Sequence, residues 1–269
     1  MKNIEPKKLC LANLPTPIQK VVFEGKSFLI KRDDFTGLET SGNKIRKLEY
    51  LLYKAKKEKA DYVFTTGGEQ SNHARTTAVS SASIGLKSKL FLWGKDSANA
   101  DGNLFLDKIF GAELRFLSKA EFINSSKIMS DEEINFKKKN KKIFLIPEGG
   151  SSTLGIWGYI NFIHELNSQL ELKKLNGITA ASGSGGTAAG MLIGLTLLGL
   201  KTKIFAVNVL YEKKIITEKI FTLVYDCIKE FNLKIKIDES LLEIVDGYST
   251  EGYKNISADK LSVIRSEER

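Results

Sequence analysis

Three polar segments of the chain carry residue types that could hold a small cofactor. Lys44 follows Gly42 and Asn43 at the start of a helical pattern. Segment 67–73 is a polar turn, and segment 182–187 is a glycine-rich loop. An amine, a polar turn and a glycine-rich loop are the parts that bind an aldehyde carrying a phosphate. They point to pyridoxal 5′-phosphate (PLP), and therefore to amino-acid chemistry.

Lys44 is the residue that could react with such an aldehyde. A lysine that forms a Schiff base must present its amine to the cofactor and not to bulk water. Gly42 permits close approach of the backbone, and the helix that follows holds the lysine in place. The alternative is a surface lysine on the first turn of a helix, and this segment by itself does not separate the two interpretations.

The loop 182–187 is the candidate phosphate site. It follows an apolar strand pattern at 178–181 and precedes an apolar helix. Its glycines let several backbone N–H groups converge, the helix N-terminus adds partial positive charge, and Ser184 and Thr187 can donate from their hydroxyls. A phosphate site is therefore favoured over an ordinary flexible turn. The loop lacks the ending of a Walker motif, and strand 204–209 has no acidic residue at its end, which disfavours a dinucleotide site.

The segment Gln70-Ser71-Asn72-His73 lies between a strand pattern and a helix. The functional interpretation places Asn72 against a ring oxygen of the cofactor and Ser71 against the substrate. The alternative is that Ser71 or Asn72 is an ordinary N-cap of the helix. His73 is a candidate base, although the sequence shows no partner for it.

Apolar strand patterns alternate with helical patterns along most of the chain. Leu48, Leu51, Leu52 and Ala55 recur at the spacing of a helix that buries one face. Such alternation predicts an α/β architecture with a largely parallel sheet. The expected strands are 62–66, 89–93, 143–146, 178–181 and 204–209, and the expected helices are 48–55, 71–84, 152–170, 186–199 and 213–231.

Composition narrows the class of protein. The 269 residues, 42% of them hydrophobic, are enough for two lobes with a substantial core. The net charge is +9, but the basic residues are spread out, so we do not expect nucleic-acid binding, and the lysine-rich run 137–142 is expected to be a solvated helix end. Cys10 and Cys227 form no metal or redox pattern.

No segment is long and apolar enough to span a bilayer, and the N-terminus lacks the apolar run of a signal peptide. We therefore expect a soluble, cytoplasmic protein without membrane contact and without a metal site.

Taken in order, these segments resemble the fold type II PLP-dependent enzymes, in the branch of D-cysteine desulfhydrase and 1-aminocyclopropane-1-carboxylate (ACC) deaminase. The patterns Gly-Asn-Lys-x-Arg-Lys-Leu-Glu and Gln-Ser-Asn-His are highly specific in combination. The resemblance covers nearly the whole chain. Its segments are 14–17, 29–37, 41–51, 67–75, 146–159, 182–190 and 246–253.

The resemblance implies an α/β fold of two lobes, each a mostly parallel twisted sheet flanked by helices. Residues 1–48 and 154–269 would form the large, PLP-binding lobe, and residues 49–153 the small lobe. Family members continue beyond the position matched by Arg269, with a tyrosine that faces the substrate and a residue that contacts the pyridine nitrogen. We therefore interpret the chain as shortened at its C-terminus.

The resemblance also assigns roles to individual residues. Lys44 would be the Schiff-base lysine and the base that moves the α-proton, and Ser71 would hold the substrate carboxylate or assist proton transfer. Asn72 would bind the cofactor's 3′-oxygen. The phosphate would be bound by Lys47, Gly183, Ser184, Gly185, Gly186 and Thr187.

The activity implied is that of a lyase on a small amino acid, with D-cysteine giving pyruvate, hydrogen sulfide and ammonia. The Gln-Ser-Asn segment followed by His73 is closer to the desulfhydrase branch. One alternative is ACC deamination, in which the ring opens to give 2-oxobutanoate and ammonia. Others are an inactive, truncated PLP-binding paralogue and a synthase that replaces the β-substituent. The resemblance further suggests a homodimer.

Overall fold

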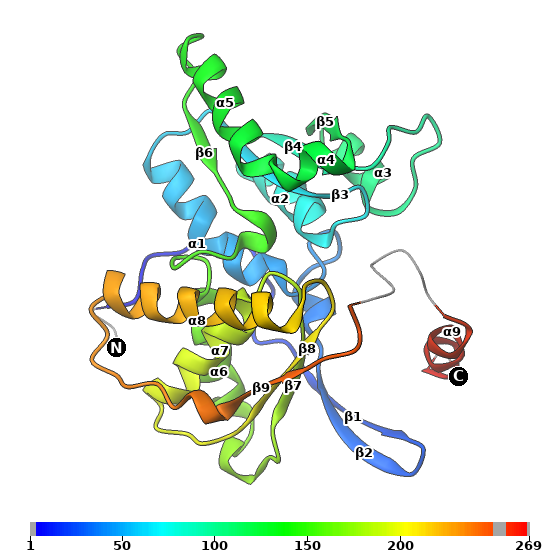
Figure 1. The fold of residues 1–269 in the computed structure, drawn as a ribbon, viewed down its shortest axis with the longest axis vertical. Helices are drawn as coiled ribbons and strands as arrows, with labels where there is room; N and C mark the ends of the chain where they lie inside the picture. The colour runs from blue at the N-terminus through cyan, green and yellow to red at the C-terminus, as the bar shows by residue number, and fades with distance from the viewer. Residues whose placement is uncertain (1–3, 250–256, 268–269) are drawn as a thin grey trace. The chain divides into compact units, whose positions relative to one another are not determined.

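The computed structural model describes residues 4–249 and 257–267. Contacts within the chain divide it into two compact units, Met1–Asn161 and Phe162–Arg269 (Figure 1). The division falls within one helix, α6 (Trp157–Gln169). The assignment of residues 1–48 to one lobe with residues 154–269, and of residues 49–153 to the other, stays a prediction.

The first unit contains a four-stranded parallel sheet in the order β5-β4-β3-β6. The central strand β3 is buried along nearly its whole length, which is why its sequence is almost continuously apolar or small. The strands are β3 (Tyr62–Gly68), β4 (Lys87–Trp93), β5 (Glu113–Leu117) and β6 (Ile143–Leu145). The helices are α1 (Lys44–Lys57), α2 (Asn72–Ser83), α3 (Gly102–Ile109), α4 (Lys119–Ile123) and α5 (Ser125–Lys137).

Two short pieces precede α1 in the same unit. Strands β1 (Ile18–Phe23) and β2 (Lys26–Lys31) form an antiparallel hairpin that is separate from the four-stranded sheet. A 3-10 turn, η1 (Asp33–Thr36), follows the hairpin. A second 3-10 turn, η2 (Glu148–Gly150), follows β6 and leads toward α6. Both of these 3-10 turns contact the first turns of α1.

The second unit repeats the same alternation on a smaller sheet. Its three strands are parallel and lie in the order β7-β8-β9. The strands are β7 (Ile178–Ser182), β8 (Ile204–Asn208) and β9 (Leu242–Val245), and the helices after α6 are α7 (Gly186–Leu197), α8 (Lys213–Glu230) and α9 (Ala258–Glu267). The 3-10 turns η3 (Leu172–Lys174) and η4 (Glu239–Leu241) complete the unit.

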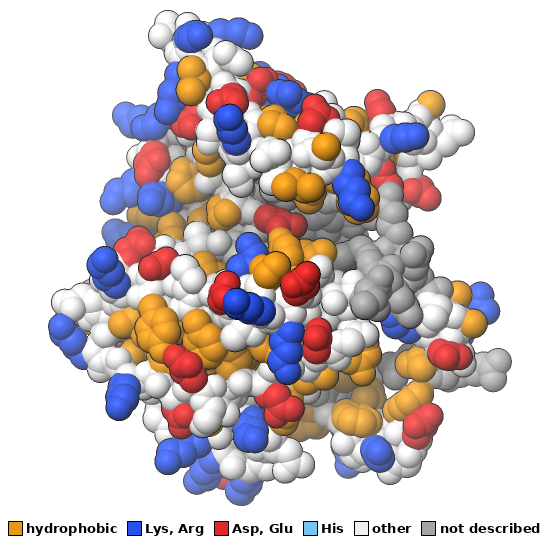
Figure 2. Space-filling model, viewed as in Figure 1, with side chains coloured by type: hydrophobic (Ala, Val, Ile, Leu, Met, Phe, Trp, Pro, Cys, Tyr) orange, Lys and Arg blue, Asp and Glu red, His pale blue; other side chains and the backbone are white. Residues whose placement is uncertain are grey.

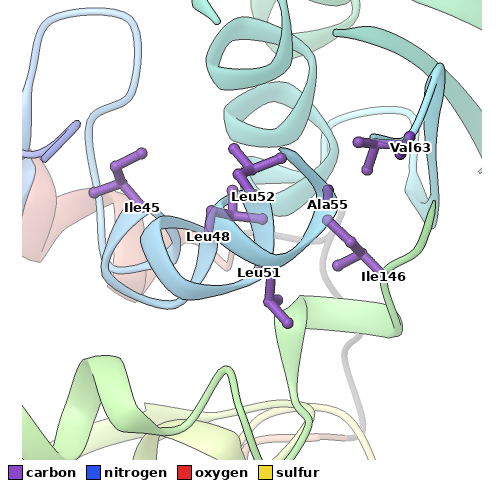
Figure 3. Packing of buried hydrophobic residues seen from close by; sticks show 8 residues of the cluster. Ile45, Leu48, Leu51, Leu52, Ala55, Val63 and Ile146 are labelled. Atoms are coloured by element: carbon purple, nitrogen blue, oxygen red, sulfur yellow. The ribbon is translucent and has the colours of Figure 1, made fainter. Parts of the chain in front are cut away.

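The apolar face of α1 is fixed in the core of the first unit. Ile45, Leu48 and Leu52 have no exposed surface and pack with Val63 of β3 and Ile146, which follows β6 (Figure 3). Burying one such side chain stabilises the fold by about 1.5–3 kcal/mol. The helix that begins at Lys44 therefore has a defined position against the sheet.

The structure confirms the predicted α/β class with parallel sheets flanked by helices. All five expected strands are present, with ends within two residues of the prediction. The structure adds β5, β9 and the helices α3, α4 and α5, none of which the sequence analysis placed. In the late segment 246–253, Gly252 and Tyr253 lie outside the described residues.

The surface agrees with the interpretation of the basic residues. Lys and Arg side chains alternate with Asp and Glu across the face seen in Figure 2. Helix α5 ends at Lys137, and residues 137–142 are all exposed, which confirms that this run is a solvated helix end. Among residues 4–249 and 257–267, no helix has the length and apolar character needed to cross a bilayer.

Candidate active site

Helix α1 begins at Lys44 and places Lys47 three residues later on the same side of the helix. Lys44 is partly buried, and its Nζ donates to Asn43 Oδ1 at 2.7 Å. Lys47 is only 1% exposed. Within one helical turn, therefore, one lysine side chain is partly buried and another is almost completely buried.

Burial changes the acid–base behaviour of both lysines. Loss of water lowers the pKa of Lys44 to about 8. The pKa of Lys47 is lowered well below its ordinary value, first by burial and second by the charge of Lys44. Within the described part of the chain, neither amine is paired with a carboxylate. The pair can therefore supply a neutral, nucleophilic amine and attract an anion.

Two residues of the segment after β6 hold the Lys47 side chain. Its Nζ donates to the carbonyl oxygen of Gly149 at 3.1 Å and to Ser151 Oγ at 3.2 Å. A lysine ammonium has three donors, so these two bonds leave one for an anion such as a phosphate. The sequence analysis placed Gly149 and Ser151 in a family segment but gave them no role.

The first turn of α1 is fixed by a buried polar cluster around Asp33 of η1. Arg46 forms an ion pair with Asp33 at 2.8 Å, and a second guanidinium nitrogen, Nε, donates to the same carboxylate at 2.9 Å. The hydroxyl of Tyr159 also donates to Asp33, at 3.0 Å, as does that of Thr16. Such bidentate contacts fix an orientation as well as a position. These bonds fix the side chain of Arg46, which lies between Lys44 and Lys47 in the sequence.

The start of α6 packs directly on the backbone of α1. A Cβ atom added to Gly158 would lie 2.3 Å from the carbonyl oxygen of Arg46, and one added to Gly155 would lie 2.1 Å from that of Gly150. Real side chains do not tolerate such distances. Glycine at these two positions is therefore required for the packing that supports Lys44 and Lys47.

Helix α2 carries the second predicted group of site residues. Ser71 is its N-cap, and the Oγ accepts from the backbone N–H groups of His73 and Ala74 at 3.2 Å each. The N-cap alternative is thus correct for Ser71, but its O–H hydrogen can still donate. Asn72 is exposed, and its Oδ1 accepts from Asn103 at 3.0 Å, so its amide N–H₂ remains the group that could reach a cofactor oxygen.

His73 does not fit the role of a catalytic base. Its Nε2 lies 2.8 Å from Thr65 Oγ1, and that hydroxyl donates to the carbonyl oxygen of Ile146. The imidazole must therefore donate to Thr65 from its Nε2–H. Burial, followed by the charges of Lys44 and Lys47, lowers the pKa of His73 to about 3. The residue is a buried structural neighbour of the lysines.

The predicted phosphate loop lies in the second unit, between β7 and α7. Gly185 has φ +84° and forms the N-cap of α7. An added Cβ would lie 2.9 Å from Cγ1 of Ile220 on α8, so both backbone angle and space require glycine. The first N–H groups of the twelve-residue α7 have no partner within the helix, and Thr187 lies in its first turn. This donor set fits a phosphate.

The structure thus brings Lys44 and Lys47 together, and places Ser71 and Asn72 side by side on α2 within the same unit. The loop of Gly183, Ser184, Gly185, Gly186 and Thr187 belongs to the other unit. The lysine pair suits an aldehyde that carries negative charge, and the glycine loop by itself suits a phosphate. Each fits a group of PLP, the cofactor predicted from the sequence.

Comparisons with known proteins agree with this donor set. Residues 9–262 match the family model described as "Pyridoxal-phosphate dependent enzyme". A Thermotoga maritima protein provisionally named 1-aminocyclopropane-1-carboxylate deaminase is 39% identical over 262 residues, which are 96% of this chain and 83% of that protein. A mitochondrial bifunctional D-cysteine desulfhydrase/1-aminocyclopropane-1-carboxylate deaminase of Arabidopsis thaliana is 43% identical over 214 residues, covering 74% of this chain and 53% of that protein.

A solved structure shows the same fold. The crystal structure of an ACC deaminase homologue has a TM-score of 0.88 and 34% sequence identity, covering 97% of this chain and 79% of that one. The family match spans both the lysine pair of α1 and the glycine loop before α7. The chain belongs to the family of pyridoxal-phosphate dependent enzymes.

Proposed function

We propose that the protein is a PLP-dependent lyase that converts D-cysteine to pyruvate, hydrogen sulfide and ammonia. The observation that carries the proposal is the lysine pair of α1. Lys44 is an amine whose pKa is lowered to about 8, and Lys47 next to it is buried without a carboxylate partner in the described residues. This arrangement suits an aldehyde that carries negative charge.

The predicted site residues other than Ser71 would hold the cofactor. Lys44 would bind its aldehyde covalently. Lys47 would donate its remaining N–H to the phosphate, and the loop 183–187 is the other segment to which the family resemblance assigns phosphate binding. The Asn72 amide would donate to the 3′-oxygen. When bound, PLP supplies an electron sink for the carbanion at the substrate α-carbon.

The chain's own groups would then move the protons. The amine of Lys44 would accept the α-proton of the substrate, because its lowered pKa leaves it partly neutral. The O–H of Ser71 donates to the substrate carboxylate while its oxygen caps α2. Loss of the sulfur from Cβ as hydrogen sulfide, followed by addition of one water, gives pyruvate and ammonia.

ACC deamination is the second candidate function. It is supported by the names of the Thermotoga maritima relative and of the solved homologue, and the Arabidopsis protein carries both names. Lys44 and Ser71 would take the same positions. The bond that breaks would join the α-carbon to a ring carbon, whereas in D-cysteine it joins Cβ to sulfur. The products would be 2-oxobutanoate and ammonia.

We further propose that the protein acts as a cytoplasmic homodimer. A cytoplasmic location is supported by Cys10 and Cys227, which are free thiols, as is usual in a reducing compartment. The homodimer rests on the family resemblance. Sedimentation equilibrium of the PLP-saturated protein would give twice the chain mass if the proposal is correct, and a monomer mass would contradict it.

The function is tested by supplying PLP and comparing D-cysteine, L-cysteine and ACC as substrates. Borohydride reduction followed by peptide mapping would identify the lysine that carries the cofactor. We expect modification of Lys44, its loss in Lys44→Ala, and sulfide with pyruvate from D-cysteine. Lys54→Ala is the matched control, because Lys54 is exposed on the same helix.

The outcomes separate the candidates. Formation of 2-oxobutanoate from ACC without sulfide from D-cysteine would favour the second function. Modification at Lys44 without any keto acid would indicate a PLP-binding protein that is not a lyase. Modification of another lysine in the folded wild-type protein would overturn the assignment of Lys44.

A further inference from the structure

Arg75 connects the two sequence motifs that carry the proposed site. It lies in the first turns of α2, four residues after Ser71, and is 9% exposed. One of its terminal nitrogens, Nη2, donates to the carbonyl oxygen of Ser41. Ser41 belongs to the turn that leads directly into Lys44. The guanidinium therefore reaches from the helix of Ser71 and Asn72 to the turn that presents Lys44.

That turn needs an external support. The N-cap residue of α1, Asn43, makes no capping hydrogen bond with its side chain, and Gly42 adopts a φ of +110°. The backbone N–H of Gly42 donates to the backbone carbonyl oxygen of Asp33 at 3.0 Å and to the Thr36 hydroxyl at 3.2 Å. These contacts tie Gly42 to residues of η1. Arg75 holds the residue before it from α2.

Asp107 is a buried acidic side chain in the surroundings of Arg75. It lies on α3, which packs against α2, and its carboxylate is fully buried. Neither carboxylate oxygen has a hydrogen-bond partner among the described residues, and the same is true of Arg75 Nε. The charge of Arg75 nevertheless acts on Asp107, and that of Asp107 on Arg75.

Such an arrangement is unfavourable for stability alone. A buried charge pair without direct hydrogen bonds is usually less stable than apolar side chains of similar volume. Polar groups left unsatisfied in a core are concentrated at sites with another purpose. The contact between Arg75 and Ser41 supplies that purpose here, because it fixes the residue three positions before Lys44.

We propose that Arg75 is a positioning residue for Lys44. Arg75 does not touch the reacting atoms. It ties the turn before Lys44 to the helix that begins at Ser71, so the amine and the Ser71 hydroxyl keep a constant spacing. The inference rests on the proposed role of Lys44 as the cofactor-binding amine.

The test measures how Lys44 reacts, not only whether the enzyme turns over. Wild-type protein, Arg75→Gln and Arg75→Lys are incubated with PLP, reduced with borohydride at timed intervals, and mapped by mass spectrometry. We expect modification of Lys44 in Arg75→Gln to slow by about 10- to 100-fold, because small displacements of a reacting group have effects of this size. Arg75→Lys should recover part of the rate, since it keeps one charged donor.

A second readout does not involve the cofactor. Hydrogen exchange of the backbone amides of residues 42–45 should accelerate in Arg75→Gln and stay close to wild type in Arg115→Gln. Arg115 pairs with Glu132 at 3.4 Å, away from the turn, and is the matched control. If Arg75→Gln does not fold, Arg75→Lys and Asp107→Asn are compared by the same two measurements.

The results separate failure of this inference from failure of the proposed function. Modification of a lysine other than Lys44 in wild-type protein would overturn the proposed function, while faster exchange in the turn would still support the positioning role. Folded Arg75→Gln with a wild-type rate at Lys44 and unchanged exchange would overturn the inference. So would a loss of stability that leaves both quantities unchanged in the folded fraction.

Discussion

The ammonium of Lys47 donates to the carbonyl oxygen of Gly149, 3.1 Å away and 102 positions later in the chain. The bond joins α1 to the segment after β6, where Gly149 and Gly150 both have positive φ. Burial of a lysine ammonium is unfavourable unless an anion compensates for the water that the ammonium loses. The geometry therefore holds Lys47 ready for a negatively charged ligand, and this has a measurable consequence.

Replacing Lys47 by methionine should weaken PLP binding by about 10- to 100-fold, because one hydrogen bond to a charged group contributes about 1.5–3 kcal/mol. Methionine fills a similar volume and leaves the apolar packing of α1 in place. Absorbance titration with PLP would give the dissociation constant. Lys57→Met, at an exposed position on the same helix, should bind as wild type does. Equal affinity in Lys47→Met would contradict a phosphate role.

The lowered pKa of Lys44 predicts how its reaction with aldehydes depends on pH. Since the neutral amine is the nucleophile, borohydride-trapped modification of Lys44 should reach half its maximum rate near pH 8. An ordinary exposed lysine would do so near pH 10.4. Timed trapping between pH 6 and pH 11, with the modified peptides quantified separately, would measure both. A midpoint for Lys44 equal to that of exposed lysines would refute the effect of burial.

The same shift has a consequence for stability. Between pH 8 and pH 10.5 the unfolded chain holds a proton on Lys44 that the folded protein has released. Stability rises with pH wherever the unfolded state binds more protons. Without PLP, the free energy of unfolding in urea should therefore increase more over this range in wild-type protein than in Lys44→Met. Parallel curves for the two proteins would exclude such a contribution.

Ser71 can be separated into its two roles by substitution. Ser71→Ala removes an N-cap and should destabilise the protein by about 1 kcal/mol. Ser71→Asp keeps a side-chain acceptor for the N–H groups of His73 and Ala74 but has no O–H donor when ionised. We expect both variants to lose turnover of D-cysteine and only the alanine variant to lose the cap. Wild-type turnover in Ser71→Asp would show that the hydroxyl does not act on the substrate.

The central strand β3 was predictable because it is buried along nearly its whole length. Segments such as β3 are read directly from the sequence as short apolar runs. Strand β5 was missed because only its last residue, Leu117, is buried, so its pattern is mixed. Helices α4 and α5 were missed for the same reason, since most of their residues are exposed.

The candidate site was predictable only in part. The positions of Lys44 and Lys47 on one helix follow from local spacing, and Ser71 was recognised as a candidate cap. The partners of Lys47 and the bond from Arg75 to Ser41 join residues 34 to 104 positions apart. No local pattern encodes such bonds. The contacts of His73 could not be predicted from the sequence, because Thr65 and Ile146 lie on other elements.

Gly158 tests how strongly α6 supports α1. Gly158→Ala should destabilise the protein by about 1–3 kcal/mol or more, the usual effect of overpacking, because the new methyl group would lie 2.3 Å from the carbonyl oxygen of Arg46. Backbone displacement at Arg46 should also reduce modification of Lys44 by PLP. Gly68→Ala is a suitable control, since its added methyl group would lie 4.0 Å from the carbonyl oxygen of Trp93. Equal urea midpoints for the two variants would contradict the close packing.

Asp107 should impose a pH dependence on stability that runs opposite to that of Lys44. Burial raises the pKa of its carboxyl to about 7, against the lowering effect of Arg75. Between pH 4 and pH 7 the folded protein therefore holds a proton that the unfolded chain has lost. Where the folded state binds more protons, stability falls as the pH rises.

Asparagine at position 107 cannot ionise, so Asp107→Asn should lose this component of the pH dependence. Urea unfolding at several values between pH 4 and pH 8 should show a smaller decrease in stability for Asp107→Asn than for wild-type protein. Asp226→Asn, at an exposed position on α8, should follow the wild-type curve. If Asp107→Asn also follows that curve, the carboxyl is ionised throughout the range, and Arg75 then stabilises its charge more strongly than burial opposes it.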